Sequence, residues 1–160
     1  MRILLIFLVF TFFAGNTVSS QDSLPPLNRQ IVEYVKSTIG YQIDRGECWD
    51  LAYQALTRAE ADWNGDYIYG KQLDPKKDKI LPGDIIQFEN VVIKYYRGTK
   101  RFTERMEHHT AIVYKIKGKR VFEIAHQNTS FSGRTVGLST LDLTTIVEGE
   151  IFIYRPVEQQ

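Results

Sequence analysis

The sequence predicts an α+β fold in which N-terminal helices pack on a twisted antiparallel β-sheet. Two helical patterns lie before residue 62, and short β-branched and aromatic segments dominate after residue 80. Helices that precede strands in this way are typical of α+β domains. The chain has 160 residues, of which 43% are hydrophobic and 24% charged, values that are ordinary for one globular domain.

The first 20 residues differ in composition from the rest. The single basic residue Arg2 precedes an apolar run over residues 3–14, and small polar residues follow as far as Ser20. This pattern is typical of a secretory signal peptide, so residues 1–20 are expected to be removed and the protein secreted, extracellular or periplasmic. A retained N-terminal anchor is the alternative. The run is short for a membrane span, and no stable membrane insertion is expected.

Residues 21–160 form the expected domain, and their charges balance. Of the 20 basic residues all but Arg2 lie here, and they match the 19 acidic residues. A nucleic-acid-binding surface needs an excess of basic residues, so no nucleic-acid partner is expected. The domain is expected to be a monomer.

Two helices are expected ahead of the sheet. The first carries apolar residues at helical spacing from the N-cap Asn28 to Gly40, after a non-helical Pro25–Pro26. The second is expected from Glu47 to Ala61. Its face around Cys48 is small and apolar, which allows close packing on a sheet.

The remaining chain is expected to alternate between strands and turns. Residues 64–79 and the charged residues 98–107 are interpreted as loops, and 140–147 is ambiguous. Strands are expected at residues 85–88, 91–96, 109–116, 120–125 and 151–154.

Cys48 is the only cysteine of the chain. Because disulfides need pairs, it is a buried apolar residue, an intermolecular link or a reactive thiol. Its expected place is the first turn of the second helix, where the macrodipole and free N–H groups stabilise a thiolate. Cys48 is therefore a candidate nucleophile, and a buried residue on an alanine-rich face is the alternative.

His109 opens an alternating strand in which Ala111 and Val113 share its face. We expect that face to meet the helices, so that His109 can reach the thiol and act as base and then as acid. His108 points to the opposite face. A solvated pair of histidines at a strand end is the alternative.

A third polar group is expected from residues 126–128. A hairpin turning at Lys117–Lys119 places His126 opposite His109. A polar group beside a catalytic histidine fixes its tautomer, and His126, Gln127 or Asn128 can do so, His126 best by register. An ordinary polar strand end is the alternative.

An oxyanion donor and a metal site are two further features that the sequence can indicate. Gln42 lies six residues before Cys48 and can place its amide near the reacting carbonyl, or it is a solvated loop residue. Histidine, cysteine and carboxylate residues do not cluster at ligand spacing, so neither a metal nor another cofactor is expected.

Four motifs occur in order along the chain, at residues 46–52 (GECWDLA), 82–88 (PGDIIQF), 109–113 (HTAIV) and 126–128 (HQN). Together they resemble the CHAP and NlpC/P60 families of papain-like cysteine peptidases and amidases. The GECWDLA form is also similar to the cysteine-proteinase-fold domain of some fungal actin-patch proteins. The resemblance covers about residues 30–155.

The resemblance implies a papain-like fold of the NlpC/P60-CHAP type, with Cys48 as nucleophile and His109 as base. CHAP proteins usually have Glu where this chain has His126, whereas NlpC/P60 members commonly have His, so the third role stays open between His126 and Asn128. The implied activity is cleavage of amide bonds, with peptide or cell-wall (peptidoglycan) substrates. The rival hypothesis is a binding or scaffold module that keeps the fold without turnover, and a toxin or deamidase-type effector is a third.

Overall fold

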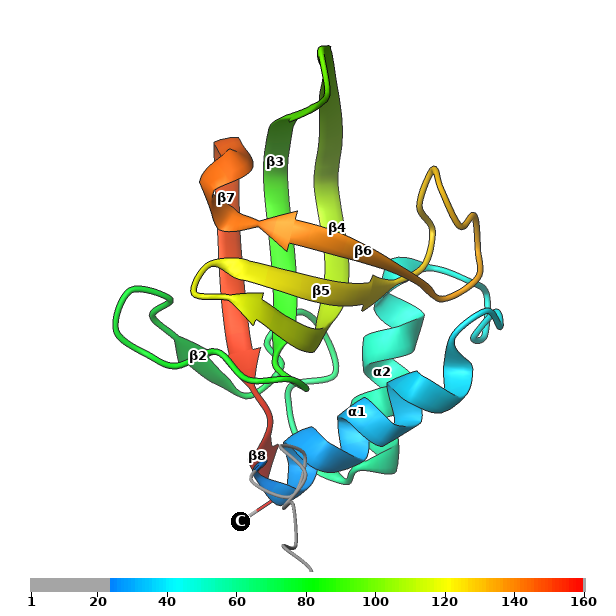
Figure 1. Ribbon diagram of the computed structural model, residues 1–160. Helices are drawn as coiled ribbons and strands as arrows, with labels where there is room; N and C mark the ends of the chain where they lie inside the picture. The colour runs from blue at the N-terminus through cyan, green and yellow to red at the C-terminus, as the bar shows by residue number, and fades with distance from the viewer. Residues whose placement is uncertain (1–23, 160) are drawn as a thin grey trace, which may run out of the picture.

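Two helices lie against one end of a six-stranded antiparallel sheet in the computed structural model of the chain (Figure 1). The structure describes residues 24–159, and the expected signal peptide over residues 1–20 lies outside them. The α+β class and the packing of N-terminal helices on an antiparallel sheet are confirmed.

Helix α1 spans Pro26–Thr38 and begins earlier than expected. Pro26 stands in its first turn, where a proline fits because its φ is already helical and the N–H it lacks would be unpaired. The expected N-cap Asn28 is instead a buried helical residue whose amide donates to the Pro82 carbonyl at 2.8 Å. The assignment of Asn28 as N-cap and of Pro26 as non-helical is therefore wrong.

Helix α2 spans Cys48–Arg58, with Glu47 as its N-cap. The Asp50 carboxylate accepts from the Glu47 N–H at 3.1 Å and from the Arg45 N–H at 3.0 Å, which anchors the first turn. The helix ends three residues before the expected Ala61. Its small apolar face is buried against α1 and the sheet, as expected.

The strands are β1 (Ala61–Asp62), β2 (Lys71–Leu73), β3 (Ile85–Arg97), β4 (Lys100–Gly118), β5 (Val121–His126), β6 (Gly137–Asp142), β7 (Ile146–Arg155) and β8 (Val157–Glu158). The main sheet has the order β2-β7-β3-β4-β5-β6, and β1 pairs with β8. A short 3₁₀ helix, Leu143–Thr145, joins β6 to β7. In Figure 1, β5 and β6 cross the direction of β3 and β7 steeply, so the sheet is strongly curved.

The expected loop over residues 98–107 is mostly strand. The β3–β4 ladder continues to the pair Arg97–Lys100, so the two strands form one long hairpin whose tip extends beyond the rest of the sheet (Figure 1). Tyr95 and Phe102 stack across the strands with ring centroids 5.4 Å apart, and the Arg97 guanidinium lies over both rings. These cross-strand contacts stabilise a hairpin whose charged composition suggested a loop.

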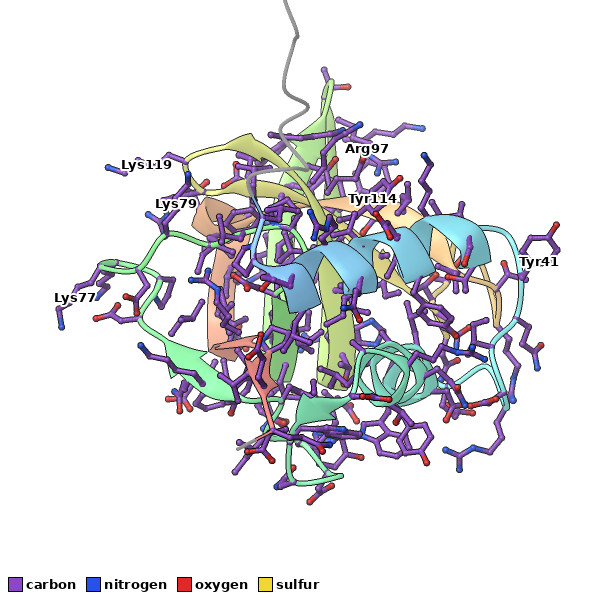
Figure 2. All side chains as sticks on the ribbon, turned by 90° about the horizontal axis from the view of Figure 1, so that it is seen from below. Tyr41, Lys77, Lys79, Arg97, Tyr114 and Lys119 are labelled. Carbon is purple, nitrogen blue, oxygen red and sulfur yellow. The ribbon has the colours of Figure 1, made fainter. Side chains whose placement is uncertain are left out.

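The core has two parts, one on each face of the sheet. One cluster joins both helices to the sheet and includes Ile31, Leu56 and Ile112. The other, which includes Phe88 and Phe122, lies on the opposite face, where β5 and β6 curve over it. Seen from below in Figure 2, α1 lies across the sheet while α2 is viewed end-on.

Candidate functional site

Cys48 is half-buried at the start of α2, and a glycine turn and a buried amide hold the loop ahead of it. Gly46 has a φ of +81°, and a Cβ there would lie 2.6 Å from the Arg134 Cβ. The buried Gln127 amide donates to the Ile43 carbonyl at 3.1 Å and to the Glu47 carbonyl at 2.9 Å. Gln127 is thus a clamp between the end of β5 and the N-terminus of α2.

Burial raises the pKa of the Cys48 thiol. Hydrogen bonds from the backbone of Thr110 and Trp49 act in the opposite direction, but they do not outweigh the desolvation of the thiolate. The helix N-terminus had suggested a lowered pKa, and partial burial reverses that direction. The resting thiol is therefore protonated at neutral pH.

A row of hydrogen-bonded side chains crosses β4, β5 and β6. The His109 Nε2 and His126 Nδ1 atoms lie 2.9 Å apart, and the His126 Nε2 and Ser139 Oγ atoms lie 2.9 Å apart. Burial lowers the pKa of His109 to about 4 and that of His126 to about 3, with a smaller effect from the neighbouring histidine in each case. Both imidazoles are therefore neutral at neutral pH.

The two histidines meet although the expected register is wrong. Residue 126 is not opposite residue 109, because β4 pairs with β5 through Ile112–Ala125, and bulges shift the ladder nearer the turn. The histidines therefore meet diagonally rather than directly across the ladder. The expected orientation is also wrong, since Ala111 and Val113 pack in the cluster away from the helices.

The tautomer of the row decides which imidazole nitrogen is free to accept a proton. When the Ser139 hydroxyl accepts from His126 Nε2–H, His126 Nδ1 must accept from His109 Nε2–H, and His109 Nδ1 carries a free lone pair. Among residues 24–159 no hydrogen bond to that Nδ1 is present, nor one between an imidazole and the Cys48 thiol. Ser139 was not foreseen, because nothing distinguishes it from other strand serines in the sequence.

One hollow of about 530 Å³ brings four of the expected site residues together: Cys48, His109, His126 and Asn128. It runs along the edge of β4, so residues from both faces of that strand reach it. The Asn128 amide donates to the Glu47 carboxylate at 2.7 Å, which ties it to the helix cap instead of to His109. Of the two candidates for the third role, His126 is the one that bonds to His109.

Gln42 lies apart from this group. It is exposed, it does not line the hollow, and its amide donates to the Asp44 carbonyl at 3.1 Å. His108 is on the hollow's wall, where its Nδ1 lies 2.9 Å from the Glu89 carboxylate and its ring meets Tyr67 edge-on.

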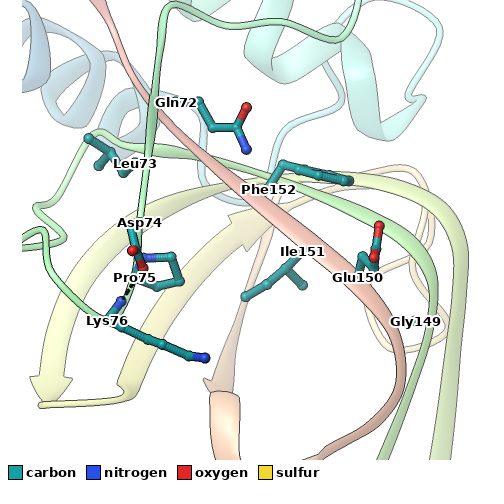
Figure 3. Close-up of a pocket in the computed structure, with 9 residues that line it drawn as sticks. All are labelled: Gln72, Leu73, Asp74, Pro75, Lys76, Gly149, Glu150, Ile151 and Phe152. Carbon is teal, nitrogen blue, oxygen red and sulfur yellow. Dashed lines mark hydrogen bonds between the residues drawn. The ribbon is translucent and has the colours of Figure 1, made fainter.

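A second hollow, about 780 Å³, lies between β7 and the chain that follows β2 (Figure 3). It is larger, but its lining contains neither a cysteine nor a histidine: Gln72, Leu73, Asp74, Pro75, Lys76, Gly149, Glu150, Ile151 and Phe152. We therefore place the candidate chemistry in the hollow that contains Cys48.

Neither a cluster of metal-binding side chains nor a membrane-spanning helix is present among residues 24–159. Between residues 24 and 159, His, Cys, Asp and Glu side chains nowhere gather in a group of three or more that is placed to hold a metal ion. No helix in that range has both the length and the apolar character needed to cross a membrane.

Comparison with known proteins gives a family and one curated relative. The family model of the AIM3/BBC1 cysteine proteinase-fold domain matches residues 26–160. The chain is similar to Altered inheritance of mitochondria protein 3 of Debaryomyces hansenii, with 26% identity over 168 residues, which cover 89% of this chain and 18% of the relative. The chain thus spans about a fifth of that relative's length.

Among the solved structures that resemble the domain, two are of Ly7917. Its crystal structure has a TM-score of 0.47 and 16% identity, over 79% of this chain and 62% of that one. The crystal structure of Ly7917 with the hydrolyzing product of MDP has a TM-score of 0.48 and 17% identity, over 81% of this chain and 62% of that one.

Proposed function

The chain belongs to the AIM3/BBC1 cysteine proteinase-fold domain family, and on that premise we propose that it hydrolyses amide bonds through Cys48. One observation carries the proposal: the lone thiol, at a helix N-terminus, shares a hollow with a row of hydrogen-bonded imidazoles. A nucleophile, a base and a group that orients the base are what a thiol hydrolase needs. We also propose that the fold is of the NlpC/P60-CHAP type and that the domain is secreted.

In the proposed reaction His109 Nδ1 takes the thiol proton as Cys48 Sγ attacks the carbonyl carbon. The backbone N–H groups at the start of α2 donate to the oxyanion. The C–N bond then breaks, and His109 gives the proton to the leaving amine. Water attacks the thioester while His109 takes one of its protons, and that proton returns to Sγ as the carboxylic acid leaves.

The pKa directions favour general-base catalysis over a preformed ion pair. His109, with a pKa of about 4, is a neutral proton acceptor at neutral pH. Cys48 keeps its proton until a substrate arrives, because burial raises its pKa. The thiol is thus deprotonated by His109 only as it attacks an electrophile.

The amide in this proposal is not assigned to a cell wall. The curated relative is a protein of Debaryomyces hansenii, a yeast, and yeasts build no peptidoglycan. The expected peptidoglycan substrate therefore gains no support from it.

A binding or scaffold module is the second candidate function. The observation that favours it is the protonated thiol, which makes no hydrogen bond to an imidazole in the described part of the chain. A module of this kind needs the hollow but no proton transfer between Cys48 and His109.

The iodoacetamide alkylation rate of Cys48 against pH separates the two candidates. We expect His109→Ala to slow alkylation at pH 7 at least about tenfold, the lower range for a general base. Gln42→Ala, at an exposed residue outside the hollow, is the control and should leave the rate within about twofold. Equal rates in the wild type and His109→Ala would overturn the hydrolase and leave the binding module.

A further inference from the structure

The long β4 strand has one edge that is only partly covered. On one side it pairs with β3 from Lys100 to Ile112. On the other side β5 pairs only with residues 112–118, so within the described chain residues 100–111 have no strand partner there. Figure 1 shows this part of β4 extending past β5. Alternate residues of an open edge present unpaired N–H and C=O groups.

The hollow that contains Cys48 follows this open edge. Seven consecutive β4 residues, Thr103 to His109, line it. Side chains of a strand alternate between two faces, so a hollow that touches all seven must run beside the backbone. Cys48 and His126 line the same hollow, as does the segment 128–131.

We infer that an extended peptide segment of a partner protein binds in this hollow by adding a strand to the open edge of β4. The peptide would continue the line that β5 leaves after His126, and its main-chain groups would pair with those of β4. The inference deepens the proposed function by naming the ligand as an extended peptide. It requires no chemistry at Cys48 and holds equally for a binding module.

The side chains around the edge suit a selective ligand. Glu104, Arg105 and Glu107 place both signs of charge along it, which opposes indiscriminate pairing. Met106 is partly buried, and Phe131, 56% exposed, offers apolar contact across the hollow. A peptide therefore gains main-chain hydrogen bonds along β4 and side-chain contacts at these residues.

The open edge of β7, beside the hollow of Figure 3, is less suited to this role. A register irregularity interrupts the β3–β7 ladder between Glu89 and Val92. Gly149 packs so closely against this irregularity that a Cβ there would lie 2.3 Å from the Asn90 carbonyl oxygen. A bulge of this kind bends an edge and hinders strand addition.

Peptide binding is measured on the chain carrying Cys48→Ala, which cannot turn over a substrate. The probe is a positional pool of fluorescein-labelled, N-acetylated hexapeptides, followed by fluorescence anisotropy. In the tightest-binding peptide each backbone nitrogen is then methylated in turn. We expect methylation at alternate positions to weaken binding about tenfold and at the intervening positions less than twofold, the signature of strand pairing. No binding in the pool, or losses without a period of two, would overturn the inference.

Two protein variants locate the bound peptide. Phe131→Ala should weaken binding at least about fivefold, whereas Ile116→Ala should leave it unchanged, because Ile116, though 39% exposed, lies where β5 covers β4. Equal effects of the two variants would place the peptide elsewhere. Alternating losses together with an unreactive Cys48 would refute the hydrolase alone, and a reactive Cys48 without peptide binding would refute strand addition alone.

Discussion

Two polar clusters are buried in this domain, and they differ in how completely their atoms are paired. The fully buried Asp84 carboxylate accepts from Arg155 at 2.9 and 3.1 Å, from Asn28 at 2.9 Å and from the Leu81 N–H at 2.8 Å. In the imidazole row, His109 Nδ1 has no partner among residues 24–159. Both Asp84 oxygens are paired and fasten the fold, although Asn28 Oδ1 beside them has no partner within the described chain. The unpaired His109 acceptor differs in that it lies beside a hollow, where it is free for a ligand.

The Asp84 cluster explains the Pro-Gly-Asp motif without any chemistry. Gly83 has a φ of +88°, and a Cβ there would lie 2.5 Å from the Asn28 carbonyl oxygen, so the turn fits only a glycine. Asp84 then joins this turn to α1 through Asn28 and to β7 through Arg155. The motif is structural, while the histidine motifs lead to the hollow.

The largest effect is expected from breaking the paired cluster. Asp84→Ala removes the carboxylate that pairs with the Arg155 guanidinium and the Asn28 amide, which keep only their bonds to the Lys79 and Pro82 carbonyls. We expect the free energy of unfolding to fall by about 3–5 kcal/mol. Urea denaturation measures it. Lys77→Ala, which removes only an exposed ion pair with Asp74, is the control and should have no measurable effect. A similarly negligible loss in Asp84→Ala would contradict its fastening role.

A smaller effect is expected from protonating the imidazole row. The unfolded chain takes up protons near the ordinary histidine pKa of 6.5, whereas the folded pKa values are about 4 for His109 and about 3 for His126. The folded state therefore binds fewer protons than the unfolded state between these pH values. The contribution of the two neutral imidazoles to stability is fully present above pH 6.5 and falls as the pH is lowered toward 4. At pH 4.5 we expect a loss of about 2 kcal/mol per histidine, measured by urea denaturation against pH 7.5.

A non-titrating side chain identifies the source of this acid sensitivity. His126→Gln should remove about half of the pH dependence, because one of the two buried imidazoles is then replaced by a side chain that does not titrate. A wild-type stability that does not change between pH 7.5 and 4.5 would show that these imidazoles are not held neutral.

Local patterns predicted the elements better than their contacts. The apolar spacing around Cys48 indicated α2, and alternation placed His109, Ala111 and Val113 on one face. Alternation does not say which face meets the helices, and here it is the other one. The bulges that shift the β4–β5 register leave no signature in the sequence. The sequence therefore predicts His126 directly opposite His109, whereas in the structure the two side chains meet diagonally.

Long-range contacts account for the other differences. Residues 98–107 are charged, but backbone pairing with β3 and the stacking of Phe102 on Tyr95 across the hairpin make most of them strand. Gln127 was one of three candidates beside His109, but its burial under the Cys48 loop depends on how the loop folds back onto β5. The open edge of β4 could not be predicted for the same reason, since a segment interpreted as a loop has no strand edge.

The smallest effect, expected from Ser139→Ala, tests whether the imidazole row acts on the thiol. The variant removes the hydroxyl 2.9 Å from His126 Nε2, which costs about 1 kcal/mol of stability. It also leaves His126 Nε2 without that partner, so the orientation of His126, and with it that of His109, is held less firmly toward the thiol. We expect the alkylation rate at pH 7 to fall about two- to fivefold, with a matching change in the imidazole ¹⁵N shifts. Ser139→Thr keeps the hydroxyl and should restore both. A loss of stability with an unchanged alkylation rate would mean that the row supports the fold and does not act on the thiol.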